Sequence, residues 1–249
     1  MFLRVDALKN ICRSAKFEGM SVKKYNENMN YWFIYNSCAM EGNSYSLTDV
    51  MILLKDNVTI GGKTIREHNE IMNNQRVLEY MDKALNYKLE MDEYRLKDIH
   101  KVLTQNIIEG GFYRNCEILI RGRQHMPPVP EEAMIQIKSL LKGYKAKKEE
   151  MHPIELACYM YAEVERIYPF VEENGTTARI VLNYILLQHG YRPVIMKRDD
   201  KSDINMALDE YNKTKELKSL MKIIMEYEEE ELKFYLQLRD EEHFKSFAS

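Results

Sequence analysis

The chain has few glycines and prolines, no paired cysteines and no long apolar run, and each absence excludes a class of protein. Only ten of its 249 residues are glycine and six are proline, which excludes collagen-like, low-complexity and turn-rich all-β chains. The four cysteines, Cys12, Cys38, Cys116 and Cys158, lack the paired spacing of a zinc site and the density of a disulfide scaffold. No apolar run is long enough to cross a bilayer, and charged residues interrupt the N-terminus. We therefore expect a cytoplasmic protein with no membrane partner.

The charge pattern also gives no support for a nucleic-acid partner. The net charge is only −3, and no basic stripe with interleaved aromatic residues is present. No repeat of fixed period occurs, which argues against a solenoid. Hydrophobic residues make up 45% of the chain and charged residues 30%, a composition typical of a helix-rich globular protein that can bury a good core.

Apolar residues recur at helical spacing along most of the chain, so the predicted fold class is all-α. Alternation is confined to Glu117–Arg121, which precedes Gly122, and this favours a short β-hairpin. The helices that spacing, turns and prolines predict are 26–40, 47–54, 66–85, 94–105, a helix from the prolines at 127–130 to 144, 154–167, 178–187, and two more within 203–240.

The most informative segment, residues 168–179, links two of these helices. Asn174-Gly175 is a turn pair just before the second helix, whose first backbone N–H groups have no partner within the helix. They lie at the positive end of the helix dipole and can bind an anion, which Arg179 can face from one turn further in. Glu172 is a hard oxygen ligand suited to magnesium. From the spacing alone, the alternative of an ordinary turn followed by a surface arginine is not excluded.

This segment resembles the signature of the Fic family of AMP-transferring enzymes, His-Pro-Phe-x-(Asp/Glu)-Gly-Asn-Gly-(Arg/Lys)-x-x-Arg. The matching residues are Pro169, Phe170, Glu172, Asn174, Gly175 and Arg179, and the departures are Tyr168, Glu173 and Thr176. Residues 37–43 are similar to the family's inhibitory-helix motif, (Ser/Thr)-x-x-x-Glu-(Gly/Asn). Residues 111–128 are similar to its flap beside the active site. Together these similarities cover about residues 30–215.

The resemblance implies a Fic-like helical domain with a small β-hairpin flap. Residues 1–90 would be an N-terminal helical region with an inhibitory helix at about 26–42. Residues 91–200 would be the Fic core with the flap and the motif loop, and residues 201–249 would be C-terminal helices packed on that core. The apolar face of the last helices is consistent with intramolecular packing or with a homodimer, and both stay open.

The resemblance also implies ATP with Mg²⁺ and assigns site residues. Glu172 would hold the metal, and the nucleotide would be bound by Glu173, Asn174, Gly175, Thr176, Arg179 and Asn212. The family normally has a glycine in place of Glu173 and a cation in place of Thr176, so nucleotide binding is expected to be weaker. The flap residues Cys116, Glu117, Ile118, Leu119 and Ile120 would bind a target protein by strand addition, unless they form a plain surface hairpin.

Tyr168 occupies the position of the family's base, a histidine that takes the proton from a target hydroxyl. A phenol has a pKa near 10 and an imidazole near 6.5, so ionising Tyr168 at pH 7 costs about 4 kcal/mol, or about a thousandfold in active base. Transfer is therefore expected to be slow. Two alternative roles for Tyr168 stay open. It is either a core aromatic residue that packs beside Phe170 or a residue that itself carries AMP. His152 and His189 are candidate replacement bases, but neither lies in the motif loop. The alternative for each is a residue at a helix end or on the surface.

Glu41 matches the family's inhibitory glutamate, which pairs with the residue at the position of Arg179. Ser37, four residues earlier, would lie on the same helix face. An inhibitory contact and a purely structural link between two regions are the two alternatives for this pair, and both stay open. The predicted function is a Fic-like AMP-transferase scaffold that acts on hydroxyl groups of a target protein. The alternatives are a catalytically silent nucleotide-binding or protein-interaction module, or an AMP-removing enzyme that uses Glu41.

Overall fold

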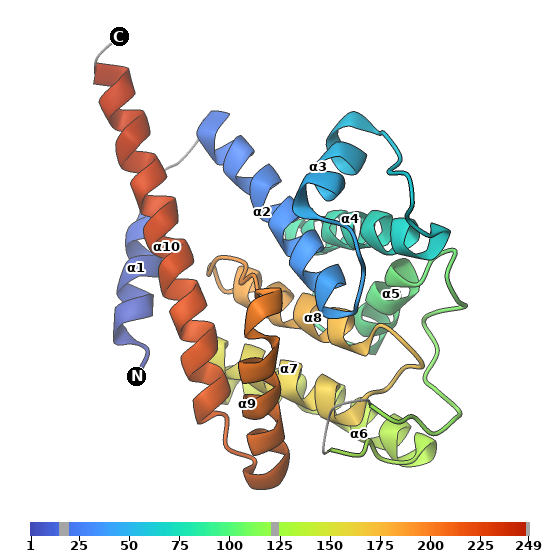
Figure 1. The fold of residues 1–249 in the computed structure, drawn as a ribbon. Helices are drawn as coiled ribbons and strands as arrows, with labels where there is room; N and C mark the ends of the chain where they lie inside the picture. Colours follow the sequence, from blue (N-terminus) through green and yellow to red (C-terminus); the bar gives the residue numbers. More distant parts are fainter. Residues whose placement is uncertain (15–19, 121–124, 248–249) are drawn as a thin grey trace.

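The computed structural model describes residues 1–14, 20–120 and 125–247, and within these residues the fold is all-α, as predicted (Figure 1). No strand is present in these ranges, and one short 3-10 helix precedes α9. The elements are α1 (Leu3–Ser14), α2 (Met20–Met40), α3 (Leu47–Asp56), α4 (Ile65–Asn86), α5 (Glu93–Leu103), α6 (Pro130–Glu150), α7 (Pro153–Ile167), α8 (Asn174–Gln188), η1 (Arg198–Asp200), α9 (Lys201–Thr214) and α10 (Lys218–Phe247).

Local signals explain where several helices begin. Ser46 and Thr64 each form a capping box, in which the hydroxyl accepts from the third helical N–H and the acidic residue there bonds back to the cap. The Asp92 side chain caps α5 by accepting a hydrogen bond from the Arg95 N–H, which corresponds to one half of such a box. Pro130 and Pro153 occupy the first positions of α6 and α7, where a missing N–H costs nothing. Each side-chain cap is worth about 1 kcal/mol.

The antiparallel pair α7 and α8 forms the centre of the molecule. Every residue of α8 from Asn174 to Leu186 is buried, and α7 is buried over most of its length. α2, α4 and α5 pack against α8, whereas α6, α9 and α10 pack against α7. The loop that joins α7 to α8 is consequently held by helices from both halves of the chain.

The first and last helices lie side by side, because α1 packs along α10 (Figure 1). The sequence predicted neither α1 nor the first turns of α2. α10 also packs on α7 and α9, and its Leu220, Ile224 and Leu232 are buried within the chain. Its apolar face therefore has intramolecular cover. No helix in the described ranges has both the length and the apolarity to span a membrane.

The predicted flap hairpin is not observed where the structure describes it. Residues 117–120 have no strand and run as an irregular segment. Residues 121–124, with the expected turn at Gly122, lie outside the described residues. Alternation over so few residues did not suffice to predict a strand, because strand formation depends on a pairing partner.

Candidate functional site

The loop between α7 and α8 begins and ends on a residue with left-handed backbone geometry. Tyr168 has φ 51° and ψ 61°, and Glu173 has φ 55° and ψ 23°. Such conformations cost about 1–2 kcal/mol for residues other than glycine and often lie at functional sites. Glu173 thus adopts the loop geometry that the family's glycine would provide. The first turn of α8 keeps its position although the glycine is missing.

Asn174 and His100 fix the interior of this loop. The Asn174 side chain accepts from the Phe170 N–H at 2.9 Å and donates to the Phe170 carbonyl at 2.9 Å. His100 stacks on the Phe170 ring with centroids 3.8 Å apart. Its Nδ1 accepts from Gly111 N–H at 2.9 Å, so its Nε2 donates to the Glu172 carbonyl at 3.2 Å. Burial lowers the pKa of His100 to about 4, which keeps the ring neutral.

The start of α8 lies beside the carboxylate of Glu41, the residue that follows α2. The N–H groups of Asn174, Gly175 and Thr176 have no acceptor within the helix. A Cβ added to Gly175 would lie 2.5 Å from Glu41 Oε1, so only glycine leaves room for this carboxylate. Glu41 is consequently placed against the first turn of α8, where a bound anion is expected.

Arg179 holds the last turn of α2 against α8. Its guanidinium donates to the Ser37 hydroxyl at 2.9 Å, to the Ser37 carbonyl at 3.0 Å and to Glu41 at 2.8 Å. A further bond at 3.1 Å joins Arg179 to the Thr176 hydroxyl. Arg179 is only 3% exposed, whereas the Glu41 side chain is 36% exposed. The structure therefore brings the predicted residues Ser37, Glu41, Thr176 and Arg179 into one cluster.

A cavity of about 160 Å³ opens beside this cluster. This volume is about half that of the smallest typical ligand pockets, about 300 Å³. Tyr168 lines the cavity, so it is not packed into the core beside Phe170. The lining residues are Met40, Glu41, Ile120, Tyr161, Glu165, Tyr168, Gly175, Arg179, Lys201 and Asn205.

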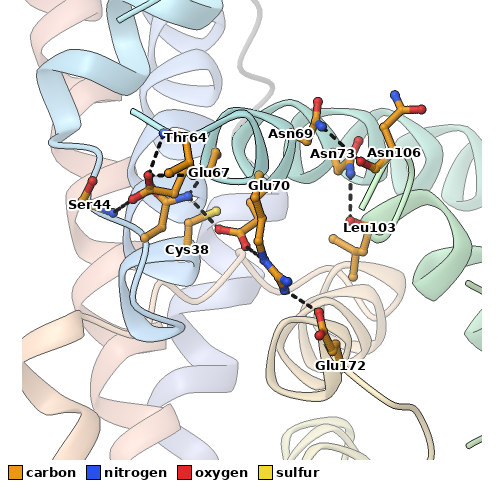
Figure 2. Close-up of polar contacts among 12 residues, drawn as sticks. Cys38, Ser44, Thr64, Glu67, Asn69, Glu70, Asn73, Leu103, Asn106 and Glu172 are labelled. Carbon is orange, nitrogen blue, oxygen red and sulfur yellow. Dashed lines mark hydrogen bonds and ion pairs between the residues drawn. The ribbon is translucent and has the colours of Figure 1, made fainter. Parts of the chain in front are cut away.

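Glu172, the predicted metal ligand, faces a different neighbour. Its carboxylate forms an ion pair with Arg66 of α4, and Arg66 Nε also lies 3.0 Å from Glu70 Oε1. Glu70 Oε2 accepts from Asn43 Nδ2 at 2.8 Å. Figure 2 shows Glu70 between the end of α2 and Glu172, with Ser44, Thr64 and Glu67 meeting beside it. A polar chain therefore links the segment just after Glu41 to the motif loop.

Glu173 carries less negative charge than its residue type implies. Burial raises its pKa to about 7, and the carboxylates of Glu41 and Glu70 add to the rise, whereas a bond to Thr176 and the charge of Arg179 oppose it. Near neutral pH about half of the Glu173 side chains are protonated. The repulsion of an anion that the sequence predicted at this position is correspondingly smaller.

The base of the flap is attached to the motif loop through Arg114. Its backbone N–H donates to the Pro169 carbonyl at 2.9 Å, and its Nε donates to the Tyr168 carbonyl at 2.7 Å. Other guanidinium nitrogens donate to the carbonyls of Cys116, at 2.9 Å, and Pro128. Arg114 is itself buried. Sequence analysis gave this arginine no individual role, because all its partners are backbone carbonyls that no side-chain pattern reveals.

The predicted flap residues differ in their relation to the cavity. Ile120 lines it, and Cys116, Glu117 and Leu119 are exposed to solvent, with Ile118 half-buried. The segment is therefore mostly exposed to solvent, and the strand expected there is not formed.

Three other predicted positions, Asn212, His152 and His189, lie away from the cavity. Lys201 and Asn205 of α9 line the cavity, whereas Asn212 lies two turns further along this helix. His152 caps the far end of α7 and contacts Asp6 at 3.2 Å. His189 ends α8 and bonds to the Ile185 carbonyl at 2.8 Å. Neither histidine is near Tyr168, so both occupy the helix-end positions that sequence analysis weighed against a catalytic role.

Several cavity residues were not singled out from the sequence. Tyr161 and Glu165 lie one turn apart on α7 and share a helix face, and Tyr168 follows the end of this helix. Their positions just before the motif loop were a usable signal for both. Lys201, which donates to the Met40 carbonyl, and Asn205 reach the site from α9, and no local pattern connects them to it.

The fold and the site together define an all-α domain in which the loop and helix start between the two central helices lie against the end of α2. Residues 90–186 match the sequence model of the Fic/DOC family. The chain therefore carries a Fic/DOC family domain, which confirms the resemblance seen in its motifs.

Relatives support the same assignment. "Protein adenylyltransferase Fic" of Drosophila persimilis is 27% identical over 234 residues, which cover 93% of this chain and 45% of the relative. The protein of the same name from Nematostella vectensis is 29% identical over 218 residues, which cover 85% of this chain and 50% of the relative. The chain spans about half the length of the curated relatives it matches.

Two solved structures share the fold. A Fic domain containing signaling protein from Bacteroides thetaiotaomicron superposes with a TM-score of 0.86 at 21% identity, over 94% of this chain and 96% of that one. Fic-1 (residues 134–508) from C. elegans gives 0.82 at 23% identity, over 94% of this chain and 69% of that one.

Proposed function

We propose that this chain binds ATP at the motif loop and transfers AMP to a hydroxyl group of a target protein, and that Glu41 restrains this activity. The observation that carries the proposal is the placement of the Glu41 carboxylate against the first turn of α8, on the buried Arg179. A carboxylate there takes the position and the ligands that a phosphate group needs. The curated relatives named adenylyltransferases support the same activity.

Displacement of Glu41 is the first requirement for binding. A triphosphate at the start of α8 would receive backbone N–H donors and the planar fork of Arg179, which suits bidentate pairing with phosphate oxygens. The cavity of about 160 Å³ is too small for a whole nucleotide while Glu41 remains. Because Glu41 is partly exposed, it can swing into solvent without leaving a charge buried.

Glu172 is the residue that would hold magnesium. Magnesium in nucleotide sites is usually bound by one or two carboxylates together with phosphate oxygens, and Glu172 would supply one such carboxylate. When bound, magnesium neutralises charge that develops on the phosphates. Arg66 now pairs with Glu172, so this arginine has to release the carboxylate first.

In the transfer step, a target hydroxyl oxygen attacks the α-phosphorus and pyrophosphate leaves. Most of the acceleration in such reactions comes from positioning and from stabilisation of charge, which Arg179 and the start of α8 can supply. The target would lie along residues 116–120, with Ile120 at the cavity, and an extended segment would pair with the backbone there.

A silent nucleotide-binding module is the second candidate, and the phenol at Tyr168 favours it. Tyr168 lines the cavity but is protonated in ordinary conditions, so it cannot accept a proton as the family's histidine does. In this case the chain would bind nucleotide and act through its flap surface without transfer.

Labelled ATP and cell lysate test the proposed function. We expect little labelling by the natural chain, more by Glu41→Gly, and still more when Tyr168→His is added. Arg179→Ala in the Glu41→Gly chain is the control and should abolish labelling. Nucleotide binding by Glu41→Gly without any labelling would favour the silent module, and equally strong labelling by all chains would contradict the proposal.

A further inference from the structure

Glu165 is a buried acid on the wall of the cavity that contains Tyr168. It is 7% exposed and lies one helical turn before Tyr168 on α7. Both side chains line the cavity, together with Gly175 and Arg179. Sequence analysis gave Glu165 no role, and burying a carboxylate is costly unless its surroundings compensate for it.

The cavity wall around Glu165 carries two positive groups and a second carboxylate. The Oε1 atom of Glu165 would lie 3.4 Å from a Cβ placed on Gly175, so the carboxylate is close to the first turn of α8 and to its dipole. The Arg179 guanidinium, Lys201 and the Glu41 carboxylate line the same small cavity. Once Glu41 is displaced or removed, the positive groups that remain favour the ionised form of Glu165, which is the form that can accept a proton.

We propose that Glu165 is the general base of AMP transfer in this chain, in place of the histidine that Tyr168 replaces. The inference rests on the proposed function. The target hydroxyl gives its proton to the Glu165 carboxylate while its oxygen bonds to the α-phosphorus. The bond from that phosphorus to the bridging oxygen breaks, and the electron pair leaves with pyrophosphate.

A carboxylate suits this step better than the phenol of Tyr168. Protein kinases use an aspartate to accept the proton of a substrate hydroxyl, because their loose transition state demands little basicity. The ordinary pKa of a carboxyl group is near 4.3 and that of a phenol is near 10, so a carboxyl side chain is the better source of a base at pH 7. Glu165 presents such a group at the wall of the cavity.

The test uses the full chain with Glu41→Gly, which removes the carboxylate from the start of α8. Glu165→Gln is added to one sample and Glu165→Asp to another. Glu163→Gln is the matched control, because Glu163 is also buried on α7 but pairs with Arg166 at 2.7 Å and with Tyr211 at 2.7 Å, outside the cavity. Thermal unfolding checks that each variant folds, and calorimetry gives its affinity for ATP with Mg²⁺.

We expect Glu165→Gln to lower the transfer rate about 100-fold, the usual contribution of a general base, with ATP affinity unchanged. Glu165→Asp should keep part of the rate, and Glu163→Gln should keep all of it. The rate of the Glu41→Gly chain should rise with pH on its acid side, and this rise should disappear in Glu165→Gln.

Other results overturn the inference in distinguishable ways. Equal rates for Glu165→Gln and its parent would remove Glu165 from the chemistry and leave the proposed function standing. ATP binding without transfer in the Glu41→Gly chain would exclude both the base and the transferase and leave a nucleotide-binding module. Absence of ATP binding in that chain would contradict the proposed function itself.

Discussion

The motif loop is held on two sides, and the two sides differ in burial. On one side the buried Arg179 bonds to Ser37, Glu41 and Thr176. On the other side Glu172 pairs with Arg66, whose side chain is 52% exposed. Buried charges depend strongly on their partners, whereas exposed ion pairs contribute about 0–1 kcal/mol. Loss of the contacts on the Arg179 side should therefore destabilise the chain more than loss of those on the Arg66 side.

The two sides share an origin at the end of α2. Glu41 reaches Arg179 directly, and Asn43 reaches Glu172 through Glu70 and Arg66 (Figure 2). A displacement of the last turn of α2 would therefore loosen both sides at once. Variants on each side can separate their contributions.

Replacing Arg179 should have the largest effect. Arg179→Ala removes bonds to three side chains and leaves the buried Ser37 without its partner, so we expect a loss of about 3 kcal/mol in the free energy of unfolding. Denaturant titration measures this loss. Arg179→Lys is the control, which keeps the charge without the planar fork and should lose less. An unchanged midpoint in Arg179→Ala would show that the buried side does not hold α2.

Glu173 lies between the two sides and should make stability depend on pH. Its folded-state pKa of about 7 is above its ordinary value of 4.5, so the stabilisation is complete below pH 4.5 and is lost as the pH rises to 7. Relative to Glu173→Gln, the natural chain should lose about 2 kcal/mol over that range. Glu228 and Glu231 also have raised pKa values, but they are common to both chains and cancel. Parallel pH profiles of the two chains would contradict this expectation.

Asn43 joins the end of α2 to α4, and its loss should loosen both sides moderately. It donates to the Glu67 carbonyl at 3.0 Å and to Glu70 at 2.8 Å, and it accepts from the Tyr45 N–H at 3.0 Å. Asn43→Ala should therefore destabilise the chain by about 1–2 kcal/mol, measured by thermal unfolding. Asn43→Asp keeps only the acceptor, so its stability should lie between those of the natural chain and Asn43→Ala. A full effect from Asn43→Asp would show that the donor bonds alone matter.

Arg66 should have the smallest effect on stability. Because its ion pairs are exposed, Arg66→Ala should cost about 0.5 kcal/mol or less. The same change frees Glu172, so the affinity for Mg²⁺ in the presence of nucleotide should rise a few-fold in calorimetry. Arg76→Ala, on the same helix but bonded to Asn73 at 2.8 Å, is the matched control. Equal Mg²⁺ affinities in both variants would remove Arg66 from the metal site.

The sequence predicted the features that are encoded locally. Helical spacing and capping residues such as Ser46 and Thr64 act within a few residues, so most helices and the motif loop could be placed. α1 could not, because its stability depends on packing against α10 at the other end of the chain. The pairing of Arg66 with Glu172, and the position of Asn205 at the cavity wall, depend on how helices far apart in the sequence pack against one another.

Calorimetric titration of ATP with Mg²⁺ into the natural chain and into Glu41→Gly tests the central claim most directly. That claim is that the start of α8 and Arg179 form an anion site now covered by Glu41. Loss of this competing carboxylate should tighten binding about tenfold or more, equivalent to about 1.4 kcal/mol. Equal affinities in the two chains, or no heat in either, would contradict the claim.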